Sequence, residues 1–134
     1  MPIYPMIDDR QTSESAQLLS PIWDAKSNAI AWDFYLKDLK ARNAAIPPYA
    51  APARNTDYSN FPPTITFVGS MEPFKDETIA YVENLKSYNT PVEFELYEGC
   101  YHAFDMLGPS SSVKRDALKF TFDSFGAFYD EYCS

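Results

Sequence analysis

Residues 64–97 constrain the fold of this chain most, because a strand pattern is followed by a helix pattern and a second strand pattern. Residues 64–68 are β-branched or apolar and end at Gly69, which is typical of a buried strand. Residues 76–89 have the apolar spacing of an amphipathic helix, and Pro91 marks the end of that helix.

The second strand pattern covers residues 92–97 and has a period of two. Val92, Phe94 and Leu96 alternate there with Glu93, Glu95 and Tyr97. Such alternation predicts a half-buried strand. Two strands joined through a helix predict a right-handed crossover and therefore parallel neighbours. The sequence thus predicts an α/β fold.

Two further helices are expected outside this unit. Residues 28–42 carry an apolar stripe at the i, i+3, i+4 and i+7 positions of one helix face. The stripe consists of Trp32, Tyr35, Leu36 and Leu39. Residues 113–132 form the last predicted helix, and its aromatic side chains on more than one side require covering on more than one face. Between the two, residues 43–63 contain five prolines and predict a long ordered loop.

The first ten residues allow two interpretations. Residues 1–7 are apolar but contain two prolines, so they form at most the tail of a strand, because proline removes a hydrogen-bond donor from the ladder. Asp8, Asp9 and Arg10 follow directly. This triplet is either a solvated turn or a charge cluster in which Arg10 binds a carboxylate through two nitrogens.

Composition excludes several classes of function. A net charge of -8 argues against nucleic-acid binding, which needs clustered Lys and Arg. No apolar run approaches the ~20 residues that span a bilayer, and the first residues lack a secretory pattern, so we expect a cytosolic protein with no membrane partner. The two cysteines have no disulfide-framework or zinc-site spacing, and we expect no metal and no cofactor.

Glu72 and His102, the single histidine of the chain, are the candidate chemical groups. Each follows one of the two predicted strands, and parallel neighbours present their C-terminal loops side by side. A carboxylate that accepts from one imidazole nitrogen leaves the other nitrogen free to act as a general base. Taken alone, this pattern is better explained by a structural His–carboxylate pair or by two unrelated surface residues.

Several motifs in order resemble the C-terminal half of the hormone-sensitive-lipase-like group of α/β-hydrolase esterases. The resemblance rests on residues 4–10 (Tyr-Pro-Met-Ile-Asp-Asp-Arg), Asn28 with Ala31-Trp32 and Tyr35-Leu36, 49–54 (Tyr-Ala-Ala-Pro-Ala-Arg), 61–64 (Phe-Pro-Pro-Thr), 69–77 (Gly-Ser-Met-Glu-Pro-Phe-Lys-Asp-Glu) and 98–105 (Glu-Gly-Cys-Tyr-His-Ala-Phe-Asp). It implies one partial α/β-hydrolase domain over residues 1–134. Residues 11–63 would form a cap-adjacent helix and Pro-rich loop, and residues 64–134 a strand–helix–strand–helix unit.

The resemblance also implies catalytic roles, with Glu72 as the triad acid and His102 as the triad base. The family usually has aspartate at the position of Glu72, so the longer side chain must be accommodated here. Asp76, four residues later, is a candidate helix cap.

A second departure concerns the nucleophile. None of the four glycines frames a serine as Gly-x-Ser-x-Gly, and His102 is the only histidine, so a His-Gly-Gly oxyanion loop is also missing. Both motifs belong before residue 1 in the family. We therefore expect the 134-residue chain to be inactive or nearly so by itself.

Two hypotheses follow from this combination. The chain is the C-terminal portion of a carboxylic ester hydrolase, from a truncated or split gene or a proteolytic product, and would act on a small ester once the N-terminal half is present. Alternatively, it is a non-catalytic remnant that acts as a binding or assembly module. In that case we expect self-association through the edge at residues 1–7 or through the aromatic helix at 113–132, because an unpaired strand edge invites pairing.

Overall fold

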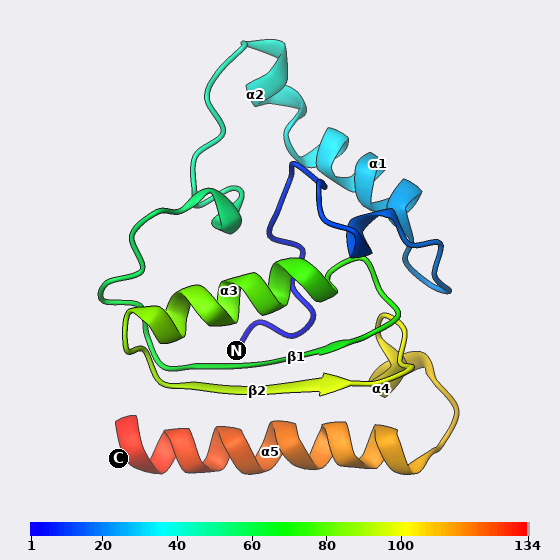
Figure 1. Ribbon diagram of the computed structural model, residues 1–134, viewed down its shortest axis with the longest axis vertical. Coiled ribbons are helices and arrows are strands. Elements are labelled where there is room, and N and C mark those ends of the chain that lie inside the picture. Colours follow the sequence, from blue (N-terminus) through cyan, green and yellow to red (C-terminus); the bar gives the residue numbers. More distant parts are fainter. Residues whose placement is uncertain (134) are drawn as a thin grey trace.

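The structure is a computed structural model and describes residues 1–133 (Figure 1). Its helices are α1 (Ala25–Tyr35), α2 (Lys37–Ala41), α3 (Lys75–Ser87), α4 (Phe104–Leu107) and α5 (Ser112–Tyr132). Its strands are β1 (Thr64–Gly69) and β2 (Val92–Tyr97), and two short 3-10 turns, η1 (Ser15–Gln17) and η2 (Pro52–Arg54), lie in the loops. None of the helices that residues 1–133 form has the length and apolarity needed to cross a membrane.

Strands β1 and β2 form a two-stranded parallel sheet, which confirms the predicted parallel pairing. Thr64 pairs with Val92 at one end of the register and Gly69 with Tyr97 at the other. Helix α3 connects the strands and covers one face of the sheet, while α5 packs on the opposite face (Figure 1). The unit is therefore a helix–sheet–helix sandwich whose strands both end at the same edge.

The two strands differ in burial: α3 and α5 contact both of them, but β1 is also contacted by the N-terminal segment, through the hydrogen bond from Tyr4 N to Phe67 O. All six residues of β1 are buried. In β2 the predicted alternation fails at its end, since Leu96 is 38% exposed and Tyr97 is partly buried. The Tyr97 ring packs edge-on against Phe67, with 5.5 Å between centroids, on the face that α5 covers.

Helix α5 shows the two-sided aromatic character expected from the sequence. Ala117 is fully buried and Phe120 packs against the cluster around Phe67. Phe122 and Phe125, on another side of the helix, are 71% and 54% exposed. The structure thus covers one aromatic face of α5 and leaves the other open.

The predicted single helix over residues 28–42 is wrong in its start and its continuity. Helix α1 begins at Ala25, because the Asp24 carboxylate accepts a hydrogen bond from the Ser27 amide at 2.7 Å and caps it. The backbone leaves helical geometry at Leu36, which separates α1 from α2. Leu36 is fully buried in a cluster that includes Trp32, Ala50 and Ala51, whereas Tyr35, predicted to share the apolar stripe, is mostly exposed.

The N-terminal segment is not a strand, although it reaches β1 through one backbone hydrogen bond, from Tyr4 N to Phe67 O at 2.8 Å.

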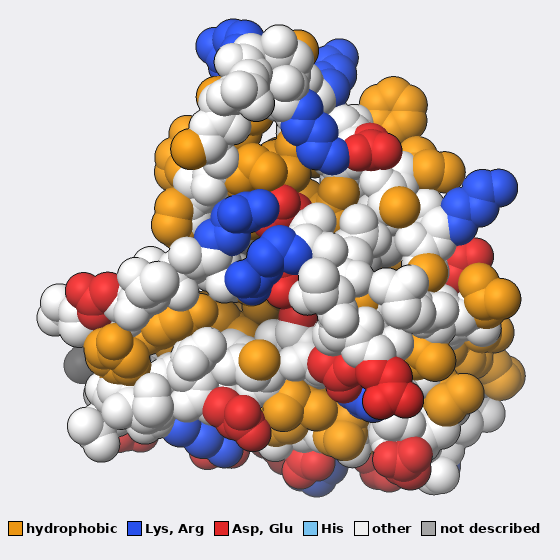
Figure 2. All heavy atoms as spheres, turned by 45° about the horizontal axis from the view of Figure 1, so that its top comes forward, with side chains coloured by type: hydrophobic (Ala, Val, Ile, Leu, Met, Phe, Trp, Pro, Cys, Tyr) orange, Lys and Arg blue, Asp and Glu red, His pale blue; other side chains and the backbone are white. Residues whose placement is uncertain are grey.

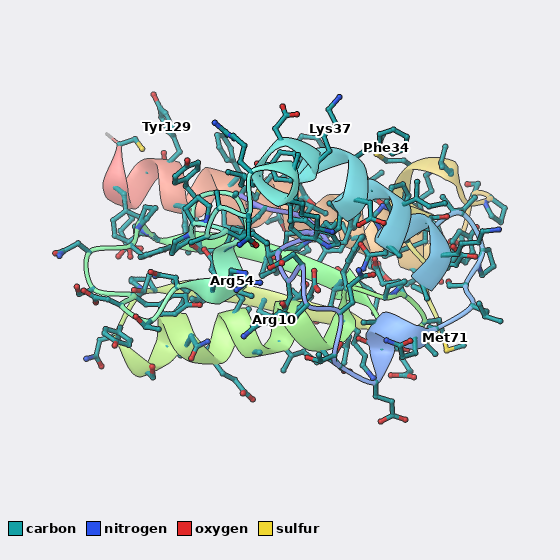
Figure 3. The ribbon with its side chains drawn as sticks, turned by 90° about the horizontal axis from the view of Figure 1, so that it is seen from above. Arg10, Phe34, Lys37, Arg54, Met71 and Tyr129 are labelled. Atoms are coloured by element: carbon teal, nitrogen blue, oxygen red, sulfur yellow. The ribbon has the colours of Figure 1, made fainter. Side chains whose placement is uncertain are left out.

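The charge-cluster interpretation of residues 8–10 is confirmed. Arg10 binds Asp8 through Nε and Nη2 at 2.7 and 2.9 Å, and Arg54 binds Asp9 in the same bidentate way at 2.6 and 2.9 Å. The two arginines lie near each other above α3 (Figure 3), and basic and acidic side chains gather in the middle of the face drawn in Figure 2. This network fixes the N-terminal segment to the turn η2.

Candidate active site

Glu72 and His102 meet at the edge of the sheet where both strands end. The His102 Nδ1 and Glu72 Oε2 atoms lie 2.7 Å apart, a hydrogen-bonding distance. The Glu72 side chain is fully buried, and 17% of the His102 side chain is exposed. The structure therefore brings together the two groups that the sequence singled out, 30 positions apart.

The loop after β1 holds the Glu72 carboxylate from its other side. The Gly69 amide donates to Glu72 Oε1 at 3.0 Å, so each carboxylate oxygen has its own partner. The extra methylene of glutamate is accommodated because the side chain folds back over its own strand end. A buried carboxylate with a hydrogen-bonding partner at each oxygen is fixed in position.

Gly69 also lets the two loops approach each other closely. A Cβ atom at position 69 would lie 2.2 Å from the Cys100 carbonyl oxygen, a distance that no side chain could occupy. That carbonyl accepts a hydrogen bond from the Met71 amide at 2.9 Å, and the Ser70 amide donates to Tyr97 O at 3.0 Å. Backbone hydrogen bonds thus tie the Glu72 loop directly to the His102 loop.

The His102 loop turns sharply on both sides of the histidine. Gly99 has φ of 72° and Ala103 has φ of 58°, both in the left-handed region. Ser70 Oγ stabilises the first turn by accepting from the Gly99 amide at 2.8 Å and donating to Glu98 at 2.9 Å. Left-handed alanine is strained, which is acceptable where surrounding contacts fix the conformation.

Three aromatic rings surround the imidazole of His102. Ring centroids of Tyr4, Phe74 and Trp23 lie 4.6, 5.2 and 6.0 Å from that of His102. A hollow of about 330 Å³ opens beside them, lined by Ile3, Tyr4, Pro5, Met6, Trp23, Phe74 and His102. Burial, together with the nearby Asp105 carboxylate, raises the pKa of Tyr4 to about 12, so this phenol stays neutral.

Sequence reasoning missed Trp23 and Tyr4 as neighbours of the histidine. Both come from irregular segments, and neither lies on a periodic stripe that would indicate its direction. Phe74 lies two residues after Glu72 in the same loop, and this closeness in sequence is the signal that could have indicated it as a neighbour of His102.

Ser15 attaches the segment that carries Trp23 to the Glu72 loop. Its amide donates to Asp76 Oδ2 at 2.8 Å, and its hydroxyl donates to Pro73 O at 3.0 Å. The prediction of Asp76 as a helix cap is wrong. The N-cap position of α3 is Phe74, and the Asp76 carboxylate instead faces outward to Ser15.

The arrangement can orient an imidazole and receive a proton. With Nδ1 bound to Glu72, the other nitrogen of His102, Nε2, is the free one. Among residues 1–133, no hydroxyl or thiol hydrogen-bonds to this ring, and no group of three or more His, Cys, Asp or Glu side chains is placed to hold a metal ion. The described site therefore contains a hydrogen-bonded carboxylate–imidazole pair, and no hydroxyl or thiol of residues 1–133 is bound to it as an activated nucleophile would be.

Comparison with known families gives a match over most of the chain. Residues 1–106 match the model of a family described as alpha/beta hydrolase fold. This region includes both Glu72 and His102. A search of curated proteins gave no match.

Solved structures of esterases have the same fold as this chain. A bacterial heroin esterase is 27% identical and superimposes with a TM-score of 0.80 over 89% of this chain and 39% of its own. The esterase LipW from Mycobacterium marinum is 23% identical with a TM-score of 0.81, over 97% and 40% of the two chains. A hormone-sensitive lipase from a metagenome library is 19% identical, with a TM-score of 0.78 over 93% and 42%.

The present chain spans about two fifths of the length of these esterases. The family match over residues 1–106 includes both strands, Glu72 and His102. The chain therefore belongs to the α/β-hydrolase fold family, and its structure corresponds to a part of each of these solved esterases.

Proposed function

We propose that this chain supplies the acid and the base of a carboxylic ester hydrolase, with Glu72 as the acid and His102 as the base. The observation that carries the proposal is the 2.7 Å contact between His102 Nδ1 and Glu72 Oε2 at the ends of two parallel strands. The α/β-hydrolase family and the esterase neighbours support the reaction class.

In the proposed mechanism, His102 Nε2 takes the proton of a serine hydroxyl as that oxygen attacks the ester carbonyl. Glu72 keeps the ring in the required tautomer and stabilises the imidazolium that forms. His102 then gives the proton to the leaving alcohol. In the second half of the reaction, a water molecule that loses its proton to His102 attacks the acyl-serine ester and releases the carboxylic acid product. The serine and the oxyanion donors come from a portion of the hydrolase outside the present sequence, which lacks a Gly-x-Ser-x-Gly turn.

The substrate class in this proposal is a small, uncharged carboxylic ester. The hollow beside His102 is lined by apolar and aromatic side chains, with no lysine or arginine among its lining residues. A charged acyl or alcohol group would lose its hydration there without gaining a partner.

Hydrolysis of a p-nitrophenyl ester tests the proposal. The chain is assayed alone and after mixing with a recombinant polypeptide that is encoded immediately upstream and carries a Gly-x-Ser-x-Gly turn. Activity that arises only on mixing, and that His102→Ala removes, supports the proposal. Activity of the chain alone that depends on His102 would contradict the absence of a nucleophile.

The exposed side of α5 favours a second candidate, a non-catalytic module that self-associates. Phe122, Phe125 and Tyr129 are 71%, 54% and 53% exposed, and a hollow of about 400 Å³ opens at the C-terminal end of this helix beside Pro62 and Pro63. Exposed aromatic side chains grouped on one helix are typical of an interaction site. A concentration-independent monomer in sedimentation, with no activity on mixing, would leave both candidates without support.

A further inference from the structure

Glu77 is a buried carboxyl group that the proposed mechanism does not use. It lies in the first turn of α3, five residues after Glu72, and is 5% exposed. Its Oε1 accepts a hydrogen bond from the Ile7 amide at 2.7 Å. Its Oε2 is buried and has no hydrogen-bond partner among residues 1–133. Burying a carboxyl group with one oxygen unpaired costs free energy, so its presence in the core calls for a structural or functional explanation.

No nearby cation forms an ion pair with the Glu77 carboxyl among the described residues. A cavity of about 100 Å³ beside it is lined by Asp8, Arg10, Ala53, Tyr58, Ala80, Tyr81 and Asn84. The Arg10 guanidinium is held by Asp8, and the nearby Arg54 by Asp9. Within residues 1–133, none of the ion pairs includes Glu77, and the carboxylates of Asp8 and Glu72 repel its charged form.

The hydrogen bond to Ile7 anchors the segment that forms one wall of the imidazole site. Ile7 is 7% exposed, and its carbonyl accepts from the Ala53 amide at 3.0 Å, so both of its backbone polar groups are bound. Upstream, the Tyr4 amide is fixed to Phe67 O at 2.8 Å. Residues 3–6, which contain the first anchor and directly precede the second, line the hollow beside His102.

We propose that Glu77 is a positioning residue for the acid–base pair, holding residues 3–6 against the His102 ring through the Ile7 amide. Helix α3 carries Glu77 and directly follows the Glu72 loop, so this one helix positions both the proposed acid and residues 3–6. The link to His102 is the Tyr4 ring, which lies edge-on at 4.6 Å. Its importance for catalysis rests on the proposed function, but the hydrogen-bonded link does not.

The charge state of Glu77 makes this link sensitive to pH. Burial raises the pKa of Glu77 from its ordinary value of 4.5 to about 8, while the backbone amides of Ile7 and Asp8 act in the opposite direction. A carboxyl with a raised folded-state pKa stabilises the fold fully below its unfolded pKa, and that stability is lost as the pH rises through the folded pKa. The contact of residues 3–6 with His102 should therefore loosen as the pH rises from about 4.5 to about 8, and should change no further above that.

NMR of the full isotope-labelled chain tests the proposal without any ester. Two signals are followed, the hydrogen exchange of the Ile7 amide and the ring proton shifts of His102, the single histidine of the chain. The variants are Glu77→Ala, which removes the acceptor, and Glu77→Gln, which keeps an uncharged acceptor of the same size. Glu83→Gln, on an exposed position of the same helix, is the matched control.

Glu77→Ala is expected to speed exchange of the Ile7 amide about tenfold, because one hydrogen bond worth about 1–1.5 kcal/mol is lost. It is also expected to move the His102 ring signals as Tyr4 shifts. In Glu77→Gln both signals stay near those of the wild type at about pH 4.5, where the Glu77 carboxyl is uncharged like the glutamine amide. The ratio of wild-type to Glu77→Gln exchange rates then rises at least about tenfold between about pH 5 and about pH 8, because only the wild type gains a charge when the site opens, and it levels off above that.

Two results would overturn the proposal: unchanged Ile7 exchange and His102 shifts in Glu77→Ala, or a pH-independent ratio for Glu77→Gln. If Glu77→Ala does not fold, the Glu77→Gln comparison decides alone. Failure of the ester assay with a positive NMR result would remove the proposed function and keep the positioning link. A working esterase with a negative NMR result would remove the link alone.

Discussion

Ser15 and Asp76 exchange two hydrogen bonds although 61 positions separate them in the sequence. The Ser15 amide donates to Asp76 Oδ2 at 2.8 Å, and the Asp76 amide donates to Ser15 Oγ at 3.0 Å. Since the same hydroxyl donates to Pro73 O, the loop that precedes α1 is bound to the loop that carries Glu72. The position of the proposed acid therefore depends on a serine far away in the chain.

Replacing Ser15 with alanine is expected to lower the free energy of unfolding by about 1–3 kcal/mol, because the Asp76 amide and the Pro73 carbonyl lose a buried partner. Chemical denaturation measures the effect. Ser59→Ala, at an exposed loop position, is the control and should change stability by less than about 0.5 kcal/mol. Equal stability of the two variants would contradict a structural role for the Ser15 hydroxyl.

Gly69→Ala is expected to destabilise the chain by about 1–3 kcal/mol or more, because the new methyl group would overlap the Cys100 carbonyl at 2.2 Å. Gly126→Ala is the opposite case. A Cβ at Gly126, an exposed position within α5, meets nothing within 4 Å, so this change should stabilise the helix by about 0.5–1 kcal/mol. Thermal unfolding that ranks Gly69→Ala above Gly126→Ala would show that the two loops do not approach as described.

Glu72→Asp shortens the proposed acid by one methylene, and we expect it to impair the proposed hydrolase. The Glu72 carboxylate spans the Gly69 amide at 3.0 Å and His102 Nδ1 at 2.7 Å, and a side chain one methylene shorter cannot keep both contacts. A displacement of about 1 Å in a catalytic group can cost roughly a hundredfold in rate. Steady-state kinetics after mixing with the nucleophile-bearing portion measure it, and an aspartate variant as fast as the wild type would contradict the fitted position of Glu72.

The Asp9–Arg54 pair should contribute stability that depends on pH. The hydrogen bonds from Arg54 lower the pKa of Asp9, outweighing the opposite effect of burial. A carboxylate with a lowered folded-state pKa stabilises the fold above its unfolded pKa, and this contribution is lost as the pH falls through the folded pKa. The stability difference between wild type and Arg54→Gln is therefore expected to shrink on acidification.

Urea unfolding at a series of pH values measures that difference. Arg42→Gln is the control, because Arg42 is exposed and its Nε donates to a backbone carbonyl, that of Asp38, rather than to a carboxylate. A difference between wild type and Arg54→Gln that stays constant from neutral to acid pH would exclude a stabilising role for the ionised pair.

The sheet and the meeting of Glu72 with His102 could be predicted because they follow from local patterns. A buried β-branched run, an amphipathic helix and an alternating run require parallel strands, and parallel strands require adjacent C-terminal loops. The partnership of Arg10 with a carboxylate was also within reach, since Asp8 lies two positions away.

Contacts between irregular segments could not be predicted in this way. Trp23 reaches His102 from a loop, and Ser15 reaches Asp76 across 61 positions, so no periodicity encodes either contact. The break at Leu36 was hidden for a different reason. The apolar spacing continues through it, and the tertiary cluster around Trp32 decides which residues stay buried. The domain division at residues 11–63 and 64–134 stays a prediction.

Nitrogen NMR of the His102 ring tests the central claim most directly, because the chain contains one histidine and its signals need no assignment. If Glu72 accepts a hydrogen bond from Nδ1, the neutral ring carries its proton on Nδ1 and leaves Nε2 bare, and Glu72→Gln disturbs that tautomer. A neutral ring that carries its proton on Nε2, with signals unaffected by Glu72→Gln, would contradict the assignment of these two residues as an acid–base pair.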